Sequence, residues 1–155
     1  MIRAILACDE NWGIGKNGSL PWPDNKADMK WFVQTTKGGV VVMGRTTFDD
    51  PHMPKPLPNR TNVVVTSKEA PKADIVVDVG SVKDLLLTME NVWVIGGAKL
   101  VKALIPVIDE FWLSTITGSY DCDTHLPKDD ILKNYKLVDT DTSIDTLSIE
   151  KWSKL

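Results

Sequence analysis

Residues 92–100, VWVIGGAKL, carry the clearest signal of the fold. A short apolar run at residues 92–95 ends at Gly96 and Gly97, and a stretch with helical character follows from Ala98. The β-branched content of the run favours a strand that is buried on both faces, as in a largely parallel sheet. Because strands that alternate with helices are typical of α/β proteins, this stretch predicts an α/β fold.

Other parts of the chain repeat this pattern. The expected strands are residues 2–8, 40–43, 62–66, 75–79, 92–95 and 111–117, and the expected helices are residues 27–36, 81–89 and 98–105. Ser81 is the expected N-cap of the second helix. Polar and apolar residues alternate in the tail, residues 135–152, which predicts an antiparallel hairpin. We therefore expect a single α/β domain over residues 1–155, with a mostly parallel central sheet flanked by helices and a C-terminal antiparallel hairpin.

The composition is that of an ordinary globular protein. Of the 155 residues, 43% are hydrophobic and 25% are charged, and the net charge is -3. This balance argues against nucleic-acid or membrane partners, and the apolar start of the chain is too short for a signal peptide or a membrane span. Cys8, Cys122, His52 and His125 lack metal-ligand spacing. We expect a monomeric cytoplasmic protein without a metal.

Residues 21–32, PWPDNKADMKWF, place a carboxylate among aromatic side chains. Helical spacing puts Asp28 beside Trp31 and Phe32, with Trp22 expected nearby. In one interpretation Asn25 caps the helix and Asp28 faces the positive end of its dipole. In the other, the carboxylate is reserved for a ligand, because an unpaired buried charge is unfavourable. The pattern alone leaves both open.

Two further features suggest anion binding. The stretches VVMGRTTF and VWVIGGAKL each lead from an apolar run through glycine into a possible helix, which can present free N–H groups to a phosphate. Neither matches a dinucleotide or Walker fingerprint, so the glycines alone indicate a nucleotide only weakly. Arg60 is the last residue of a proline-rich loop, residues 49–60, that fixes its position.

Seven segments occur in an order that resembles one known family. They are ILACDENWGIGKNGSLPW, the acid in ADMKWF, VVMGRTTF, PLPNR, VVVTS, VWVIGGAKL and DTHLP. Over essentially its full length the chain resembles dihydrofolate reductase. The resemblance implies NADPH-dependent reduction of 7,8-dihydrofolate to 5,6,7,8-tetrahydrofolate by hydride transfer. It also implies a role in one-carbon metabolism and a target for antifolates.

The same resemblance implies a substrate site. Asp28 would hold the amino-pyrimidine edge of the pterin, while the proton arrives through water that Asp28 and Trp22 organise and Leu20 gates. Arg60 would bind the α-carboxylate of the substrate, and Ser114 would hydrogen-bond Asp28. The implied substrate-binding residues are Ile5, Ala7, Asp28, Met29, Phe32, Leu57, Arg60, Ile95 and Ser114.

For NADPH, the resemblance implies that Arg45, Ser67 and Lys99 surround the 2′-phosphate. Thr46, Thr47 and the start of the helix after Gly97 would meet the pyrophosphate, and the peptide between Gly96 and Gly97 would be cis. The implied cofactor-binding residues are Ala7, Ile14, Gly15, Asn17, Gly18, Ser19, Leu20, Gly44, Arg45, Thr46, Thr47, Thr66, Ser67, Ile95, Gly96, Gly97, Ala98, Lys99, Leu100 and Val101.

The chain departs from the family pattern at several positions. Val101 stands where the family often has an aromatic residue, and Lys99 stands where arginine is frequent. Two other functions are compatible with parts of the pattern. A pyrimidine reductase of riboflavin synthesis shares the fold, the paired glycines and NADPH, but it does not require Trp22, Asp28 and Arg60 together. A non-catalytic folate- or nucleotide-binding module could keep the fold without the acid.

Overall fold

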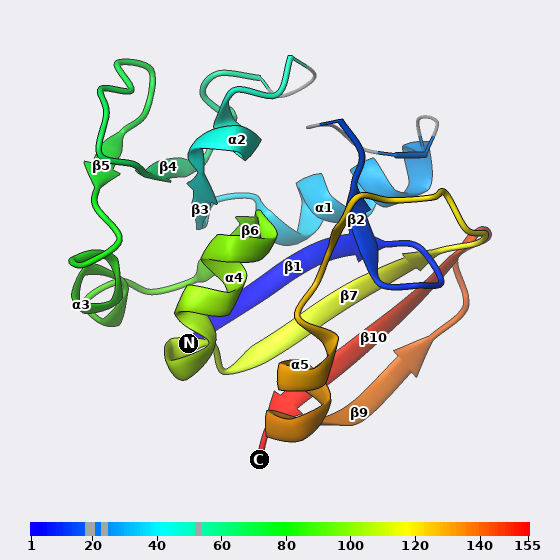
Figure 1. The fold of residues 1–155 in the computed structure, drawn as a ribbon. Helices are drawn as coiled ribbons and strands as arrows, with labels where there is room; N and C mark the ends of the chain where they lie inside the picture. The colour runs from blue at the N-terminus through cyan, green and yellow to red at the C-terminus, as the bar shows by residue number, and fades with distance from the viewer. Residues whose placement is uncertain (18–20, 23–24, 52–53) are drawn as a thin grey trace.

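The computed structural model describes residues 1–17, 21–22, 25–51 and 54–155. These residues form a large mixed sheet with a small two-stranded sheet beside it (Figure 1). In spatial order, the large sheet contains β5 (Ile75–Val77), β4 (Thr61–Val65), β3 (Val40–Gly44), β6 (Val92–Gly96), β1 (Ile2–Cys8), β7 (Glu110–Ile116), β10 (Leu147–Lys154) and β9 (Tyr135–Asp141). The small sheet pairs β2 (Gly13–Gly15) with β8 (Thr124–His125).

The large sheet is parallel from β5 to β7. β1 lies between β6 and β7 and is parallel to both, and β3 is parallel to both β4 and β6. The C-terminal strand β10 is antiparallel to β7 and to β9. The predicted mostly parallel sheet and the C-terminal hairpin are therefore confirmed.

The helices differ more from the prediction. They are α1 (Lys26–Thr36), α2 (Arg45–Phe48), α3 (Val82–Leu87), α4 (Ala98–Leu104) and α5 (Lys128–Asn134), with a 3-10 turn, η1 (Ile105–Val107), after α4. The sequence predicts the ranges of α1, α3 and α4, indicates a possible helix after Gly44, where α2 begins, and misses α5. α2 and α5 each bury a single residue, Phe48 or Ile131, which is too little for a periodic apolar pattern.

The capping prediction holds for one helix and fails for another. Asn25 caps α1, because its Oδ1 accepts a hydrogen bond from the backbone N–H of Asp28 at 3.0 Å. Ser81 precedes α3, but its side chain makes no capping bond. Instead Asp78 Oδ1 accepts the backbone N–H of Ser81 at 2.9 Å, and α3 is shorter than expected. The Asp78 carboxylate thus accepts a hydrogen bond at the start of α3, where the Ser81 hydroxyl was expected to act as the cap.

The side chains of β1 divide the core into two layers. Ala4 and Leu6 pack in the cluster that includes Leu100 and Leu104 of α4. Ile5 packs in the other cluster, against which the rings of α1 lie. Figure 1 accordingly shows α4 in front of the sheet and α1 behind it. Because β1, β3 and β6 are parallel, their carboxyl ends meet at one edge between these layers.

Candidate active site

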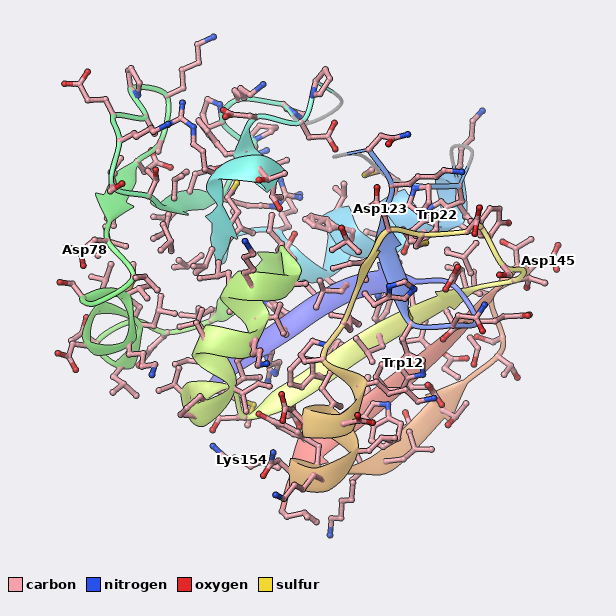
Figure 2. The ribbon with its side chains drawn as sticks, viewed as in Figure 1. Trp12, Trp22, Asp78, Asp123, Asp145 and Lys154 are labelled. Atoms are coloured by element: carbon pink, nitrogen blue, oxygen red, sulfur yellow. The ribbon has the colours of Figure 1, made fainter. Side chains whose placement is uncertain are left out.

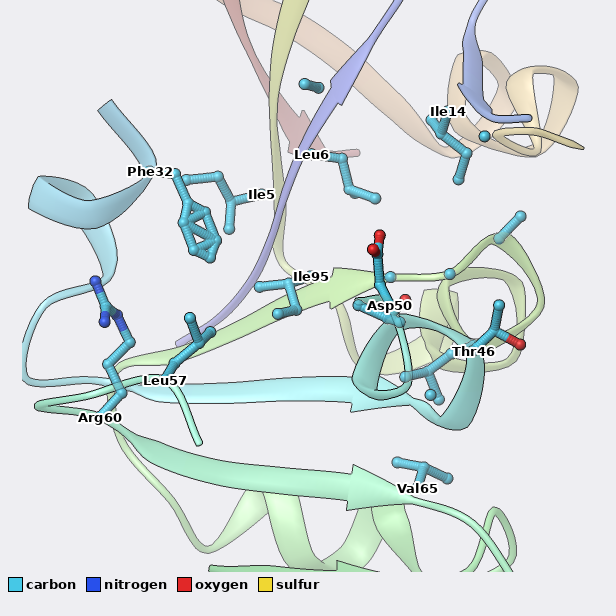
Figure 3. A pocket seen from close by; sticks show the side chains of 18 of the residues that line it. Ile5, Leu6, Ile14, Phe32, Thr46, Asp50, Leu57, Arg60, Val65 and Ile95 are labelled. Carbon is cyan, nitrogen blue, oxygen red and sulfur yellow. The ribbon is translucent and has the colours of Figure 1, made fainter. Parts of the chain in front are cut away.

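A cavity of about 950 Å³ lies at the carboxyl ends of β1, β3 and β6. Figure 3 shows Phe32, Leu57 and Arg60 toward one end of it and Ile14, Thr46 and Asp50 toward the other. Such crevices beyond the strand ends are the usual ligand sites of α/β sheets. The following residue-level features decide what this cavity can bind.

Asp28 brings a perturbed carboxyl to the cavity. It lies in the first turn of α1, where the helix dipole favours the charged form. Burial nevertheless raises its pKa from the ordinary 3.8 to about 6, opposed by a hydrogen bond from Ser114. Ser114, on β7, is itself only 1% exposed. The two interpretations of the sequence thus combine: Asn25 caps the helix, and the Asp28 carboxyl turns into the cavity.

Arg60 is held rigidly at the Phe32 end. Its Nε donates to Thr36 Oγ1 at 2.8 Å, and its Nη1 and Nη2 donate to the carbonyl oxygens of Pro58 and Val33 at 2.6 and 3.1 Å. The guanidinium also lies 5.8 Å from the centre of the Phe32 ring. All of these partners are neutral, and no ion pair among the described residues includes Arg60. Its charge is therefore available to an anionic ligand.

Glycine-rich turns form the other part of the cavity. The peptide between Gly96 and Gly97 is cis, as the family resemblance implies. Gly96 has a φ of 129°, a backbone conformation that residues with a Cβ rarely adopt, and an added Cβ would lie 3.4 Å from Thr47 Oγ1. Gly44, at the end of β3, faces the same turn. Bare backbone at the ends of β3 and β6 leaves room for a ligand to approach closely.

Arg45 begins α2 beside this turn and is already engaged. Its Nε forms an ion pair with Asp49 Oδ2 at 2.9 Å, and its Nη1 donates to the carbonyl oxygen of Glu69 at 2.5 Å. Both partners orient the guanidinium at the mouth of the cavity, which Lys99 also lines. Two cations and the hydroxyls of Thr46 and Thr47 therefore share this end, a donor set that suits phosphate groups.

Comparison with known proteins identifies the family. The model of the family described as dihydrofolate reductase matches residues 1–149. The chain belongs to the dihydrofolate reductase family. It is thus an NADPH-dependent oxidoreductase by family, and the resemblance drawn from the seven segments is confirmed.

Two curated relatives of this family illustrate the similarity. The dihydrofolate reductase of Bacillus subtilis (strain 168) is 38% identical over 146 residues, which cover 91% of this chain and 83% of that protein. The enzyme of Schistosoma mansoni is 37% identical over 168 residues, with coverage of 95% and 89%. Among solved structures, dihydrofolate reductase from Enterococcus faecalis complexed with NADP(H) and RAB-propyl has a TM-score of 0.83 and 32% identity. The match covers 99% of this chain and 96% of that one.

Most of the residues that the family resemblance implies line the cavity. These are Ile5, Ala7, Ile14, Gly15, Asp28, Met29, Phe32, Gly44, Arg45, Thr46, Thr47, Leu57, Arg60, Ile95, Gly96, Gly97, Ala98, Lys99, Leu100 and Ser114. Met29 lines the cavity as implied and is 55% exposed. Gly18, Ser19 and Leu20 lie outside the described residues.

Several implied residues lie away from the cavity lining, namely Asn17, Trp22, Thr66, Ser67 and Val101. Val101 is fully buried in the core. Trp22, labelled in Figure 2, is 6% exposed. Its ring lies edge-on to the ring of Tyr120, with centroids 6.0 Å apart. Ala7 links the two regions, because it lines the cavity and also packs against the Trp22 cluster. Trp22 thus supports the wall near Asp28 from behind.

The cavity also contains residues that the sequence analysis did not select. They are Leu6, Trp31, Val33, Lys37, Asp50, Pro54, Pro58, Asn59, Val65, Val79, Ala103 and Thr124. Helical spacing from Met29 could have found Val33 and Lys37, which follow it at intervals of four. Thr124 lies in the DTHLP segment, but no local pattern assigns it to the cavity, where the pairing of β8 with β2 places it.

Proposed function

We propose that this protein reduces 7,8-dihydrofolate to 5,6,7,8-tetrahydrofolate with NADPH, and thereby supports one-carbon and thymidylate metabolism. The observation that supports this most is Asp28, whose carboxyl faces the cavity with its pKa raised to about 6. Perturbed carboxyls in clefts are typical of catalytic sites. The family match adds the substrate and the cofactor.

Two charged side chains, Asp28 and Arg60, would bind opposite ends of the substrate. The Asp28 carboxylate would accept hydrogen bonds from the amino-pyrimidine edge, and Ser114 would hold that carboxylate in place. Arg60 would bind the α-carboxylate of the substrate through its guanidinium, which hydrogen bonds to Thr36 and Pro58 already hold in place. Ile5, Phe32 and Leu57 would exclude water around the ring. Together these contacts orient the ring for reduction.

The residues at the Gly96–Gly97 turn fit NADPH. The bare glycine backbone, the hydroxyls of Thr46 and Thr47 and the charges of Arg45 and Lys99 suit a ligand with a pyrophosphate and a 2′-phosphate. When bound, NADPH supplies the hydride. Asp28 would position the ring and the water that delivers the proton, while Trp22 would support the wall behind it.

The alternative functions are less well supported. A pyrimidine reductase of riboflavin synthesis would not need the Asp28, Ser114 and Arg60 set that this chain retains. A non-catalytic binding module would not need a carboxyl inside the cavity whose pKa is raised above its ordinary value. The family match likewise favours neither alternative.

The proposed function has a direct test. The purified protein should oxidise NADPH, followed by absorbance, only when dihydrofolate is added, with one tetrahydrofolate formed for each NADPH consumed. An inhibitor that carries a similar amino-pyrimidine edge should block the reaction. Oxidation of NADPH without dihydrofolate, or none with it, would refute the proposal.

We further propose a monomeric, cytoplasmic protein of one domain without a nucleic-acid partner. The net charge of -3 and the free thiols of Cys8 and Cys122 support this. None of the described helices is long and apolar enough to span a membrane. Light scattering should give a mass near 17.2 kDa, and a dimer mass would contradict the monomer.

A further inference from the structure

Asp9 is a buried carboxylate that the proposed chemistry does not use. It directly follows β1, and only 1% of its surface is exposed. No ion pair among the described residues includes it. A buried carboxylate is strongly unfavourable unless hydrogen bonds replace its water shell. Its hydrogen-bond donors therefore indicate its role.

The two oxygens of Asp9 hold two different segments. Oδ1 accepts the backbone N–H groups of Asn11 and Gly13, at 2.9 and 2.8 Å. Oδ2 accepts the backbone N–H of Tyr120 at 3.1 Å and the thiol of Cys122 at 3.4 Å. Oδ1 thus fixes the chain entering β2, and Oδ2 fixes the chain that leads to β8.

These two segments continue into one wall of the cavity. Gly13 pairs with His125 and Gly15 pairs with Thr124 in the small sheet. Ile14, Gly15 and Thr124 line the cavity. Figure 1 shows that β2 and the loop after β7 cross in front of the carboxyl end of β1. Asp9 is the residue that directly follows this end. The Asp9 side chain therefore holds both segments at the base of this wall.

We infer that Asp9 is a positioning residue that sets the cavity wall formed by β2 and β8. The inference rests on the proposed function, in which Ile14 of this wall covers the nicotinamide of NADPH. Asp9 touches neither the cofactor nor the substrate, since it does not line the cavity. Its effect on the reaction passes through the two segments that it joins.

The local packing and the charge state of Asp9 agree with this role. A Cβ added at Gly13 would overlap the Sγ and Cβ of Cys122, so the two segments are in close contact. Burial acts to raise the pKa of Asp9, but hydrogen bonds from Tyr120, Gly13 and Asn11 outweigh it and lower the pKa. The side chain is therefore a carboxylate at neutral pH and accepts all four donors at once.

Asp9→Asn separates the two halves of this arrangement. The amide offers one oxygen, so whichever way it turns, its NH2 group faces the donors of one segment. Asp109→Asn is a matched control, because Asp109 Oδ2 accepts the backbone N–H of Ile2 at 2.8 Å at the opposite end of β1. Cys122→Ala removes only the thiol donor, and Cys122→Ser keeps a donor there.

The test measures the Kd of NADPH by fluorescence, the KM for dihydrofolate and the melting temperature for each variant. We expect Asp9→Asn to raise the Kd of NADPH about tenfold, the effect of one lost charge-assisted hydrogen bond, and to change the KM for dihydrofolate less than about twofold. Cys122→Ala should raise the Kd of NADPH about threefold, and Cys122→Ser and Asp109→Asn less than about twofold.

Three results would overturn the inference. One is a Kd of NADPH unchanged in Asp9→Asn although its melting temperature falls as in Asp109→Asn. Another is an equal loss of affinity for both ligands. If Asp9→Asn does not fold, equal Kd values for Cys122→Ala and Cys122→Ser would overturn it. Since the Kd needs no turnover, a wild-type protein that binds NADPH but does not reduce dihydrofolate would refute the proposed function alone.

Discussion

At the scale of single residues, burial affects the pKa of Asp28 more strongly than its position in the first turn of α1 does. Its pKa is raised from 3.8 to about 6. As pH rises from about 4 to about 6, the unfolded chain therefore loses this proton before the folded protein does. The contribution of Asp28 to the free energy of unfolding therefore falls as pH rises from about 4 to about 6. Above about pH 6 the folded protein retains an unfavourable buried charge.

Asp28→Asn should consequently stabilise the protein at neutral pH. Asparagine keeps the size of the side chain without the charge, so the free energy of unfolding at pH 7 should rise by up to about 3 kcal/mol. The gain should shrink below about pH 4, where aspartate is protonated in both states. Urea unfolding at pH 7 and at pH 3.5 measures this. A variant less stable than the wild type at pH 7 would return Asp28 to a purely helix-terminal role.

Arg45 carries the prediction about cofactor choice. Its guanidinium lies at the cavity mouth, oriented by Asp49 and by the Glu69 carbonyl. Arg45→Gln should raise the KM for NADPH at least about tenfold and the KM for NADH much less, because only NADPH carries the 2′-phosphate. Lys102→Gln, an equal change of charge on the outside of α4, is the control. Equal losses for NADPH and NADH would remove Arg45 from this role.

At the scale of elements, the start of α1 connects helix stability to the site. Asn25 Oδ1 caps the backbone N–H of Asp28, and Asn25 Nδ2 donates to Thr146 Oγ1 at 3.1 Å. Asn25→Ala should therefore reduce the free energy of unfolding by about 1 kcal/mol. It should also raise the KM for dihydrofolate, because the first turn of α1 carries Asp28.

Thermal unfolding and steady-state kinetics test this prediction about α1. Asn25→Asp, which retains an acceptor at the cap, should restore most of the stability. Lys30→Ala, at an exposed position of the same helix, should change neither quantity. If Asn25→Ala and Lys30→Ala behave alike, the cap does not hold the site.

The elements that the sequence predicts are those with enough apolar residues to show a period. β3 and β6 are continuous apolar runs, β1 is apolar apart from Arg3, and α1 and α4 follow recognisable starts. The missed elements, α5, β2 and β8, are short, and β2 and β8 are stabilised by pairing across more than a hundred residues of chain. No local pattern encodes such pairing.

At the scale of the whole molecule, the parallel sheet assembles the cavity from distant parts of the chain. The family resemblance identifies most of the residues that line the cavity. A matched motif indicates where a residue lies in the fold even when the residue type alone does not. It does not give side-chain directions, as Trp22, which lies in the core, shows. Asp9 was also missed, since its partners Tyr120 and Cys122 lie 111 and 113 residues away.

Hydride transfer from NADPH to dihydrofolate, measured against pH for Asp28→Asn, tests the function of this cavity most directly. The control is Asp84→Asn, which changes an exposed aspartate in the first turn of α3. We expect turnover of Asp28→Asn at pH 7 to fall by about two orders of magnitude and to recover partly at low pH, where the substrate arrives protonated. Asp84→Asn should turn over like the wild type. Undiminished turnover in Asp28→Asn at pH 7 would contradict the assignment of Asp28 to the pterin, and with it the proposed mechanism.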